Sequence, residues 1–579
     1  MPRLLLIGAS GLDWAGFDAA TRSGRLTELA ALRARGVAGW LAGAPVSDGP
    51  AAWASIATGL QPEVHGVWRE QEEWPGGLRA SGKASWRVNP VWARLAAAWV
   101  STASVAWPAS RPGADWPGVH IDDRFPQSSA REPQDWALPR RCVPDDVRDT
   151  MRTRRVHPSQ ISGAMLVPFV PARAAIDPAR DDVLPALAVG LARAATIQSA
   201  AVWMLEEVGV EALFVHQPCI GQARAAFERR GEAHLQEVIP AAWRFVDALV
   251  GRLAALAGQD ALILIVSPGW GGAPGVVLAA GDGVGADPDF LGGSLLDIAP
   301  TVLARFGLED VALPGRRLIS VAGGGPLAPA PSPKIEPPAR ADAALVYALR
   351  RRGYRPPPRP SRAWRAQGLA DLALMMLDRD PAGAGKAAQA ALLQDPVNVT
   401  ALRVRVRAHV ALEEADPLPA LGDALLRAAP DRGWGPLAHG AYHVLRNERS
   451  SASPWLLRAE SDSDVGTLLT TAAVWFAASR PGGAERVFKA ILAKEPSNAS
   501  AEVGLAVCAA GRRDFMAAEA SLTRALKQDP GRPAIYLQFA QVYARTARKA
   551  EAARAAEIAV RLGARPAMAA AAVAGRLRA

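Results

Sequence analysis

The residues of this chain that could do chemistry lie first in the segment 45–66, PVSDGPAAWASIATGLQPEVHG. Ser47 carries a hydroxyl that could act as a nucleophile, and Asp48 beside it carries a carboxylate. Gly49, the next residue, has no side-chain oxygen. A helix is expected to follow over 52–58. A reaction at this place would therefore depend on Ser47 or Asp48, and on activating groups from elsewhere in the chain.

The pattern of this segment matches that of a known enzyme family. It resembles the nucleophile segment of the type I phosphodiesterase / nucleotide pyrophosphatase branch of the alkaline phosphatase superfamily. In this resemblance the Thr or Ser nucleophile falls on Gly49, and His65 has a structural role after the nucleophile helix. The chain thus keeps the frame of a phosphoryl-transfer site without its reactive atom. The matching residues are Pro50, Ala52, Trp53, Ser55, Ala57, Thr58, Gly59, Pro62, His65 and Gly66.

The resemblance also implies a pair of zinc ions held by three Asp and three His, and the matching positions lack these ligands. The first Asp falls on Ser10, while Asp13 keeps a second acidic position that is not a ligand and is expected to cap a helix. No histidine lies between His234 and His409, so this part of the chain cannot supply the late imidazoles. We therefore expect no zinc pair and no other cofactor. The remaining ligand positions fall on Pro218, Gln222, Pro268 and Gly269.

The altered positions are expected to converge on one pocket. His216 could replace a lost ligand, although a strand-end role is the simpler interpretation. Pro268, Gly269 and Gly271 could leave space for an anion, together with free backbone N–H groups. Whether Trp270 fills the cleft is left open. The expected pocket residues are Ser10, Asp13, Gly49, His216, Gln222 and Trp270.

The elements that must position these residues alternate along the first part of the chain. Apolar runs at 4–8, 211–216 and 261–267 predict buried strands, and the leucine spacing at 25–36 and 295–307 predicts helices. This alternation predicts an α/β fold with a mostly parallel sheet and helices on both faces. Residues 297–308 also match the family, so the resemblance covers about 1–320. We expect a domain over 1–321, with an irregular cap or insertion at about 101–168.

The rest of the chain predicts a linker and then a helical array. Residues 322–362 are rich in proline and arginine, as an extended linker would be. Beyond them, Pro396, Pro430, Pro496 and Pro530 are separated by 34, 66 and 34 residues. A 34-residue period is the signature of tetratricopeptide (TPR) repeats, so an all-α solenoid is expected over 363–579. Its concave face would bind protein partners, through residues that the sequence does not identify.

Composition indicates the class of protein and the compartment in which we expect it. The chain has 579 residues, a net charge of +10 and 21% charged residues, which is ordinary for a globular protein. Its three dispersed cysteines fit a reducing compartment, so we expect a cytoplasmic location. We expect no membrane span, because we find no sufficiently long apolar run. We find no segment in which basic and aromatic residues alternate, so we expect no specific nucleic-acid binding.

Three functions remain open on the sequence alone. The first is a catalytically inactive phosphodiesterase-like scaffold that binds protein partners through its repeats. The second is a divergent hydrolase or transferase for phosphate or sulfate esters with a rearranged site. The third is a sensor whose emptied cleft binds a nucleotide or sugar phosphate. Candidate residues for the second function are Ser47, Asp48, Asp13, His216 and Cys219.

Overall fold

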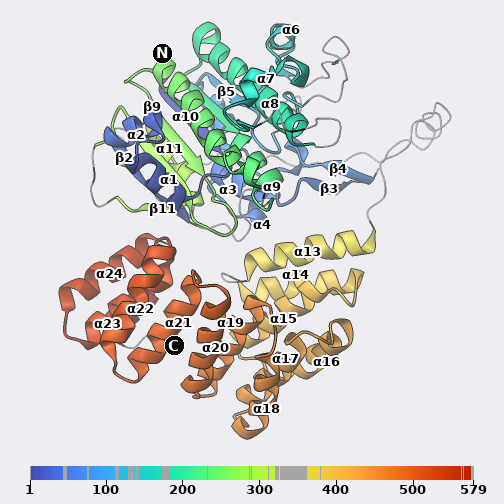
Figure 1. Ribbon diagram of the computed structural model, residues 1–579, viewed down its shortest axis with the longest axis vertical. Coiled ribbons are helices and arrows are strands. Elements are labelled where there is room, and N and C mark those ends of the chain that lie inside the picture. Colours follow the sequence, from blue (N-terminus) through green and yellow to red (C-terminus); the bar gives the residue numbers. More distant parts are fainter. Residues whose placement is uncertain are drawn as a thin grey trace, which may run out of the picture. The chain divides into compact units, whose positions relative to one another are not determined.

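The computed structural model forms two compact units, Met1–Pro357 and Pro358–Ala579 (Figure 1). The predicted linker at 322–362 lies almost wholly outside the described residues, so its extent stays a prediction. The described residues are 2–42, 49–74, 77–110, 116–127, 136, 142–172, 176, 182–230, 232–285, 287, 290–310, 312–319, 325–326, 361–377, 380–562, 564 and 566–575.

The first unit is built on one large sheet. Over the described residues it has nine strands in the order β11-β2-β10-β9-β1-β8-β5-β6-β7. Strands β9, β1, β8, β5 and β6 are successive parallel neighbours, whereas β10 runs antiparallel to β9 and β2. The predicted mostly parallel sheet is confirmed. The strands are β1 Leu4–Ala9, β2 Gly36–Ala42, β5 Thr102–Val105, β6 Val119–Ile121, β7 Cys142–Val143, β8 Ala212–Gln217, β9 Leu262–Ser267, β10 Gly275–Gly281 and β11 Gly292–Ser294.

Helices cover both faces of this sheet, as expected for buried parallel strands. Alternate residues of β1 enter different cores, because successive side chains of a strand point to opposite faces. Leu5 and Ile7 join a core with α1, α2, α8, α9 and α10, and Leu4 and Leu6 join a core with α3, α5 and α11. The helices are α1 Trp14–Arg22, α2 Thr27–Ala34, α3 Pro50–Thr58, α5 Val91–Ala97, α8 Val183–Trp203, α9 Cys219–Phe227, α10 Val238–Ala257 and α11 Ile298–Arg305.

One region of this unit differs from expectation. Residues 101–168, expected to be an irregular insertion, contribute β5, β6 and β7 to the main sheet. These strands are two to four residues long, too short for an apolar pattern to stand out among the surrounding tryptophans and prolines. Smaller elements are α4 Pro62–His65, α6 Asp145–Thr153, α7 Gly163–Leu166, the hairpin of β3 Gln71–Trp74 and β4 Gly77–Ala80, and the pair β12 Leu308–Glu309 and β13 Gly325–Pro326.

The longest helix of the unit, α8, is strongly apolar. Helix α8 continues into a π-helical turn, Met204–Val208, and Val183–Val208 together would pass for a membrane span by length and composition. Nine residues of α8 are buried inside the domain, as in the core helix of a globular protein. Arg193 is the single charged residue between Val183 and Trp203.

The second unit is a run of paired helices. Over the described residues, α13 to α24 form six successive pairs, followed by α25. The predicted helical repeats are confirmed, including the stretch 363–460, where the sequence pattern is degenerate. The helices are α13 Arg362–Met376, α14 Pro381–Gln394, α15 Val399–Ala411, α16 Leu418–Ala428, α17 Trp434–Leu445, α18 Arg449–Ala459, α19 Val465–Ala477, α20 Pro481–Lys494, α21 Ala499–Gly511, α22 Phe515–Gln528, α23 Pro533–Arg545, α24 Lys549–Arg561 and α25 Pro566–Val573.

A backbone feature marks the repeat register more evenly than the prolines do. After the first helix of five pairs, one residue other than glycine adopts a left-handed conformation with φ between 58° and 63°. These residues are Glu413, Asn447, Ser479, Arg513 and Ala547, so the intervals are 34, 32, 34 and 34 residues. The 66-residue interval between Pro430 and Pro496 is two residues shorter than two 34-residue periods. The shortening therefore lies between Asn447 and Ser479, around α18.

An aspartate occupies the turn that the shortened repeat leaves without a proline. Asp462 stands 34 residues before Pro496 and is buried. Its carboxylate accepts hydrogen bonds from the amides of Gly433 (2.6 Å) and Asp464 (2.9 Å), and it lies 3.5 Å from the Arg432 guanidinium. Burial raises the pKa of Asp462, but the two amide bonds, with Thr467 and Arg432, hold it below its ordinary value overall. One charged side chain thus ties two inter-repeat turns together.

Replacing Asp462 with alanine should lower the free energy of unfolding of the helical unit by about 1–3 kcal/mol, because two buried amides lose their acceptor. A carboxyl whose folded pKa is depressed stabilises above its unfolded pKa of about 3.9 and loses this contribution as pH falls through the folded value. The deficit of Asp462→Ala relative to wild type should therefore shrink in acid. Urea unfolding at neutral and acidic pH checks this, with exposed Asp431→Ala as the control. An equal effect of both substitutions would contradict it.

Candidate functional site

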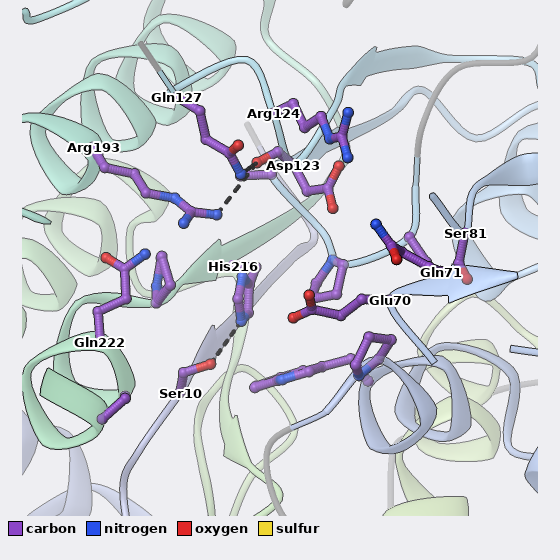
Figure 2. A pocket seen from close by; sticks show the side chains of 18 of the residues that line it. Ser10, Glu70, Gln71, Ser81, Asp123, Arg124, Gln127, Arg193, His216 and Gln222 are labelled. Carbon is purple, nitrogen blue, oxygen red and sulfur yellow. Dashed lines mark hydrogen bonds between the residues drawn. The ribbon is translucent and has the colours of Figure 1, made fainter. Parts of the chain in front are cut away.

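A cavity of about 470 Å³ opens where several parallel strands end (Figure 2). Ser10 directly follows β1, His216 lies near the end of β8, and Asp123 follows β6. These strands are parallel, so their carboxyl ends meet at one edge of the sheet. That edge is where open α/β sheets bind their ligands. The topology therefore places this cavity where a functional site is expected.

The positions singled out in the sequence separate into three groups. Ser47 and Asp48 lie outside the described residues. Asp13, Pro268 and Gly269 do not line the cavity, and Gly49 stands just before its lining residue Pro50. The singled-out residues that line it are Ser10, His216, Pro218, Gln222 and Trp270.

A buried serine and histidine pair forms the floor of the cavity. Ser10 Oγ lies 2.9 Å from His216 Nε2, and both side chains are about 5% exposed. The His216 ring packs edge-on against Trp53 and Trp107, with centroids 4.6 and 6.3 Å away. Burial lowers the pKa of His216 to about 3, the charge of Arg193 adds to this, and the Ala106 backbone opposes it. The imidazole is therefore neutral at physiological pH.

Helix α3 begins at the cavity with neither a side-chain cap nor a reactive group. Gly49 is its N-cap, and the absence of a side chain leaves the helix without the hydrogen bond that a Ser or Thr would accept there. Eight of the nine residues of α3 are buried. Further along, His65 is fully buried, lies 3.1 Å from Ser55 Oγ and accepts the Val67 amide. These bonds hold the turn after the helix, which is the structural role expected for His65.

Polar contacts through Arg224 link Asp13 to Trp270, which lines the cavity. Asp13 caps α1 by accepting the Gly16 amide at 2.8 Å, as expected. Its other oxygen pairs with Arg224 at 2.7 Å, and Arg224 also lies over the Trp270 ring. The Trp270 indole donates to Glu228, on the same helix end. Trp270 is therefore a wall of the cavity and does not fill it.

The turn after β9 uses its glycines for backbone geometry. Gly269 has φ of +102°, and a Cβ there would lie 2.1 Å from the Ala273 carbonyl oxygen. Its amide points to Ser267 Oγ at 3.4 Å and so has a partner inside the turn. The expectation that Gly269 leaves a free N–H group for an anion is not supported by this geometry.

Several charged lining residues were missed by sequence reasoning. Figure 2 shows Arg193, Glu70 and Asp123 converging on the cavity from α8, the start of the β3 hairpin and the loop after β6. Burial lowers the pKa of Arg193, and the charges of Asp123 and Glu70 partly offset this. Arg193 did carry a signal, because it is a lone charge within a long apolar helix. Other lining residues not anticipated are Gln71, Ser81, Arg124 and Gln127.

The donor set of this cavity does not fit a two-zinc centre. Such a centre needs several carboxylates and imidazoles converging on ions about 4 Å apart. Among the described lining residues, His216 is the one imidazole, and its Nε2 is engaged by Ser10. In the part of the chain that the structure describes, no three His, Cys, Asp or Glu side chains are grouped so that they could hold a metal ion.

Comparison with known proteins identifies the first unit. Residues 4–268 match the family model of type I phosphodiesterase / nucleotide pyrophosphatase. No curated protein matches the chain. The first unit is therefore a phosphodiesterase-like domain, and the paired helices that follow it are TPR-like repeats.

Solved structures similar to this chain include two that are described as TPR proteins. A TPR protein from Parabacteroides merdae is 16% identical with a TM-score of 0.30, over 40% of this chain and 90% of that one. Yeast Tom70 is 17% identical with a TM-score of 0.31, over 37% of this chain and 47% of that one. YrrB, described as a TPR protein with an unusual peptide-binding site, is 14% identical with a TM-score of 0.23, over 32% and 98%.

The depressed pKa of His216 predicts an acid sensitivity of the first unit. Between the unfolded histidine pKa of about 6.5 and the folded value of about 3, the unfolded chain binds a proton that the folded chain does not. Stability therefore falls as pH falls through this window, by about 2 kcal/mol at pH 5 for each such histidine.

Replacing His216 with glutamine should reduce the loss of unfolding free energy between pH 8 and pH 5 by about 2 kcal/mol. Urea unfolding at the two pH values measures this loss. His65 has the same pKa of about 3, also because of burial, so His65→Gln is a matched variant that should behave alike. A loss in His216→Gln as large as in wild type would show that this imidazole is protonated in the folded protein.

Proposed function

We propose that this chain, which joins a type I phosphodiesterase / nucleotide pyrophosphatase-like domain to TPR-like helical repeats, is a binding protein without phosphodiesterase activity. The observation that carries the proposal is the cavity at the carboxyl ends of the strands. There the family's nucleophile position is Gly49, and the ligand positions that line the cavity are Ser10, Pro218 and Gln222. The fold and the cavity are kept, and the groups that would perform the reaction are replaced.

The replacement removes each part of the family reaction separately. Two-metal phosphoryl transfer needs a nucleophile, metal ligands and charge stabilisation of the transferred group. Arg193 could orient an anion in the cavity, but a guanidinium neither attacks phosphorus nor activates water. Pro218 and Gln222 cannot take the place of an Asp and a His as anionic and imidazole ligands. No step of phosphoryl transfer can therefore be assigned to the described side chains.

A rearranged hydrolase is the second candidate, and the Ser10–His216 pair is the observation that favours it. A hydroxyl within hydrogen-bond reach of an imidazole is the arrangement of an activated nucleophile. The imidazole must accept the serine proton, however, and a pKa of about 3 makes His216 a poor base at neutral pH. Burial also raises the pKa of the Cys219 thiol to about 12, which leaves too little thiolate for attack. The binding function is therefore the better supported of the two.

The helical unit supplies the protein-binding part of the proposal. Successive first helices pack on one another, α13 on α15, α17 on α19 and α21 on α23. In stacked helical repeats such a row lines an extended concave surface. Ala473 and Ala477 of α19 are exposed, one helical turn apart, and leave room for a partner's side chains. A cytoplasmic location belongs to the same proposal, supported by three buried, unpaired cysteines.

Purified full-length protein should contain far less than one zinc ion per chain. It should hydrolyse bis(p-nitrophenyl) phosphate no faster than the Ser10→Ala variant, because the described cavity has neither a two-zinc ligand set nor the family nucleophile. Metal analysis and a spectrophotometric assay with added Zn²⁺ measure both. Stoichiometric zinc, or hydrolysis that Ser10→Ala or His216→Ala abolishes, would overturn the proposal.

A photo-crosslinking residue placed at Ala473 should capture a defined partner protein in cells, because this position belongs to the row of first helices. The same residue placed at exposed Arg458 of the second helix α18 is the matched control and should not capture that partner. Mass spectrometry of the crosslinked products provides the measurement. Capture of the same proteins from both positions would count against a binding surface on the first helices.

A further inference from the structure

Two cavities lie on adjacent faces of helix α9. The polar cavity described above is lined on this helix by Gly221, Gln222 and Ala225. A second, apolar groove of about 380 Å³ is lined by Cys219, Gln222, Ala223, Ala226 and Phe227. Residues three and four apart share a helix face, so these two sets are neighbouring stripes of one helix. Gln222 belongs to both sets and marks the seam between the cavities.

Helix α8 lines both cavities from the opposite side. Arg193 reaches the polar cavity, and Leu187 and Gly190 are among the α8 residues that line the groove. Arg193 and Gly190 are three residues apart, about one helical turn or 5 Å along the axis. The nearest atom to a Cβ built on Gly190 would be Gln222 Oε1, at 3.9 Å. Because Gly190 has no side chain, the seam between the two cavities is narrowed at this point by the Gln222 side chain and not by helix α8.

The head of the polar cavity offers unused hydrogen-bond donors. Arg193 is largely buried, and its guanidinium makes one long hydrogen bond, from Nη2 to the Asp123 carbonyl at 3.3 Å. Its Nε atom is fully buried without a hydrogen-bond partner among the described residues. A guanidinium pairs best with a planar oxyanion, such as a carboxylate, through two parallel bonds. The negative charges of Glu70 and Asp123 also act on Arg193, so a monoanion suits this place better than a phosphate dianion.

The groove offers apolar surface to a hydrocarbon chain. Its walls include Phe169, Leu187, Leu191 and Phe227, and Asp182 and Gln222 are its polar members. Val189 on its lining is 54% exposed, and α7, which packs on α8, exposes Met165 to the same extent. Large apolar side chains exposed around an apolar hollow indicate a binding surface.

We propose that the two cavities together bind one long-chain carboxylate, with its carboxylate group on Arg193 and its hydrocarbon chain running past Gly190 and Gln222 into the groove between α8 and α9. This inference rests on the proposed absence of turnover in the polar cavity, since the ligand would remain bound unchanged. It assigns to the domain an acyl-chain ligand, which differs in head group from the phosphate esters of the family reaction.

The test compares ligands that separate head from chain. Butanoate, octanoate and dodecanoate, with dodecanol and dodecyl phosphate, are titrated below their micelle concentrations into the full-length protein by calorimetry. Affinity for the carboxylates should rise about fourfold for each methylene that enters the groove. Dodecanol and dodecyl phosphate should bind at least tenfold more weakly than dodecanoate. Equal affinity for butanoate and dodecanoate, or for dodecanol and dodecanoate, would overturn the proposal.

Two variants test the path of the chain. Gly190→Leu should remove the dependence on chain length, because the new side chain fills the seam, while butanoate binding persists. Gly482→Leu is the control, since Gly482 also lies in a helix and a Cβ there meets nothing within 4 Å. Arg193→Gln should abolish the preference for dodecanoate over dodecanol.

The outcomes of the two proposals can be told apart. If Arg193→Gln unfolds, as its circular dichroism would show, Gly190→Leu still decides the question. Unchanged chain-length dependence in Gly190→Leu would refute the assigned path. A protein that binds no carboxylate but also lacks zinc and diesterase activity would refute this inference and leave the proposed loss of catalysis standing.

Discussion

The site depends on the packing of Trp53 directly on the backbone of β1. A Cβ on Gly8 would lie 2.5 Å from the Trp53 ring, so the indole occupies the place of a side chain. Trp53 also contacts the His216 ring, and its carbonyl accepts the Trp107 indole N–H at 3.2 Å. One large side chain thereby fixes the start of α3 and the ends of β1 and β8 relative to one another. The cavity is the space that remains above this contact.

This packing explains how the frame can persist when the reactive groups are absent. Trp53 and Gly8 are held by packing inside the domain, through contacts with each other and with the His216 and Trp107 rings. Ser10 Oγ and His216 Nε2 then pair by one hydrogen bond in a buried place, where a polar atom without a partner is costly. Gly49 leaves α3 uncapped, but eight buried residues stabilise this helix instead. The stability of the fold is therefore separate from the chemistry of the site.

The sequence predicts those features that depend on local patterns. Strands such as β1 and β9 are continuous apolar runs, which predict buried strands. The 34-residue proline spacing predicts the helical repeats. Ser10 and Gln222 could be placed in one pocket because the family resemblance puts a metal ligand at each position. Arg193 and Asp123 could not, since they come from segments far apart that only the sheet order brings together. Strand β5 was missed because four residues are too few to show a period.

The turns between repeats of the helical unit are stabilised in two ways, by a proline or by Asp462. The proline acts on the unfolded chain and Asp462 on the folded chain. A proline restricts the unfolded chain, so its contribution is a reduced loss of entropy that is independent of pH. Asp462 acts in the folded chain alone, through a charge and two amides. In a linear array each repeat contacts mainly its neighbours. The contact between two adjacent repeats therefore determines how far local unfolding spreads along the array. The shortened repeat therefore makes cooperativity along this array dependent on the ionisation of one side chain.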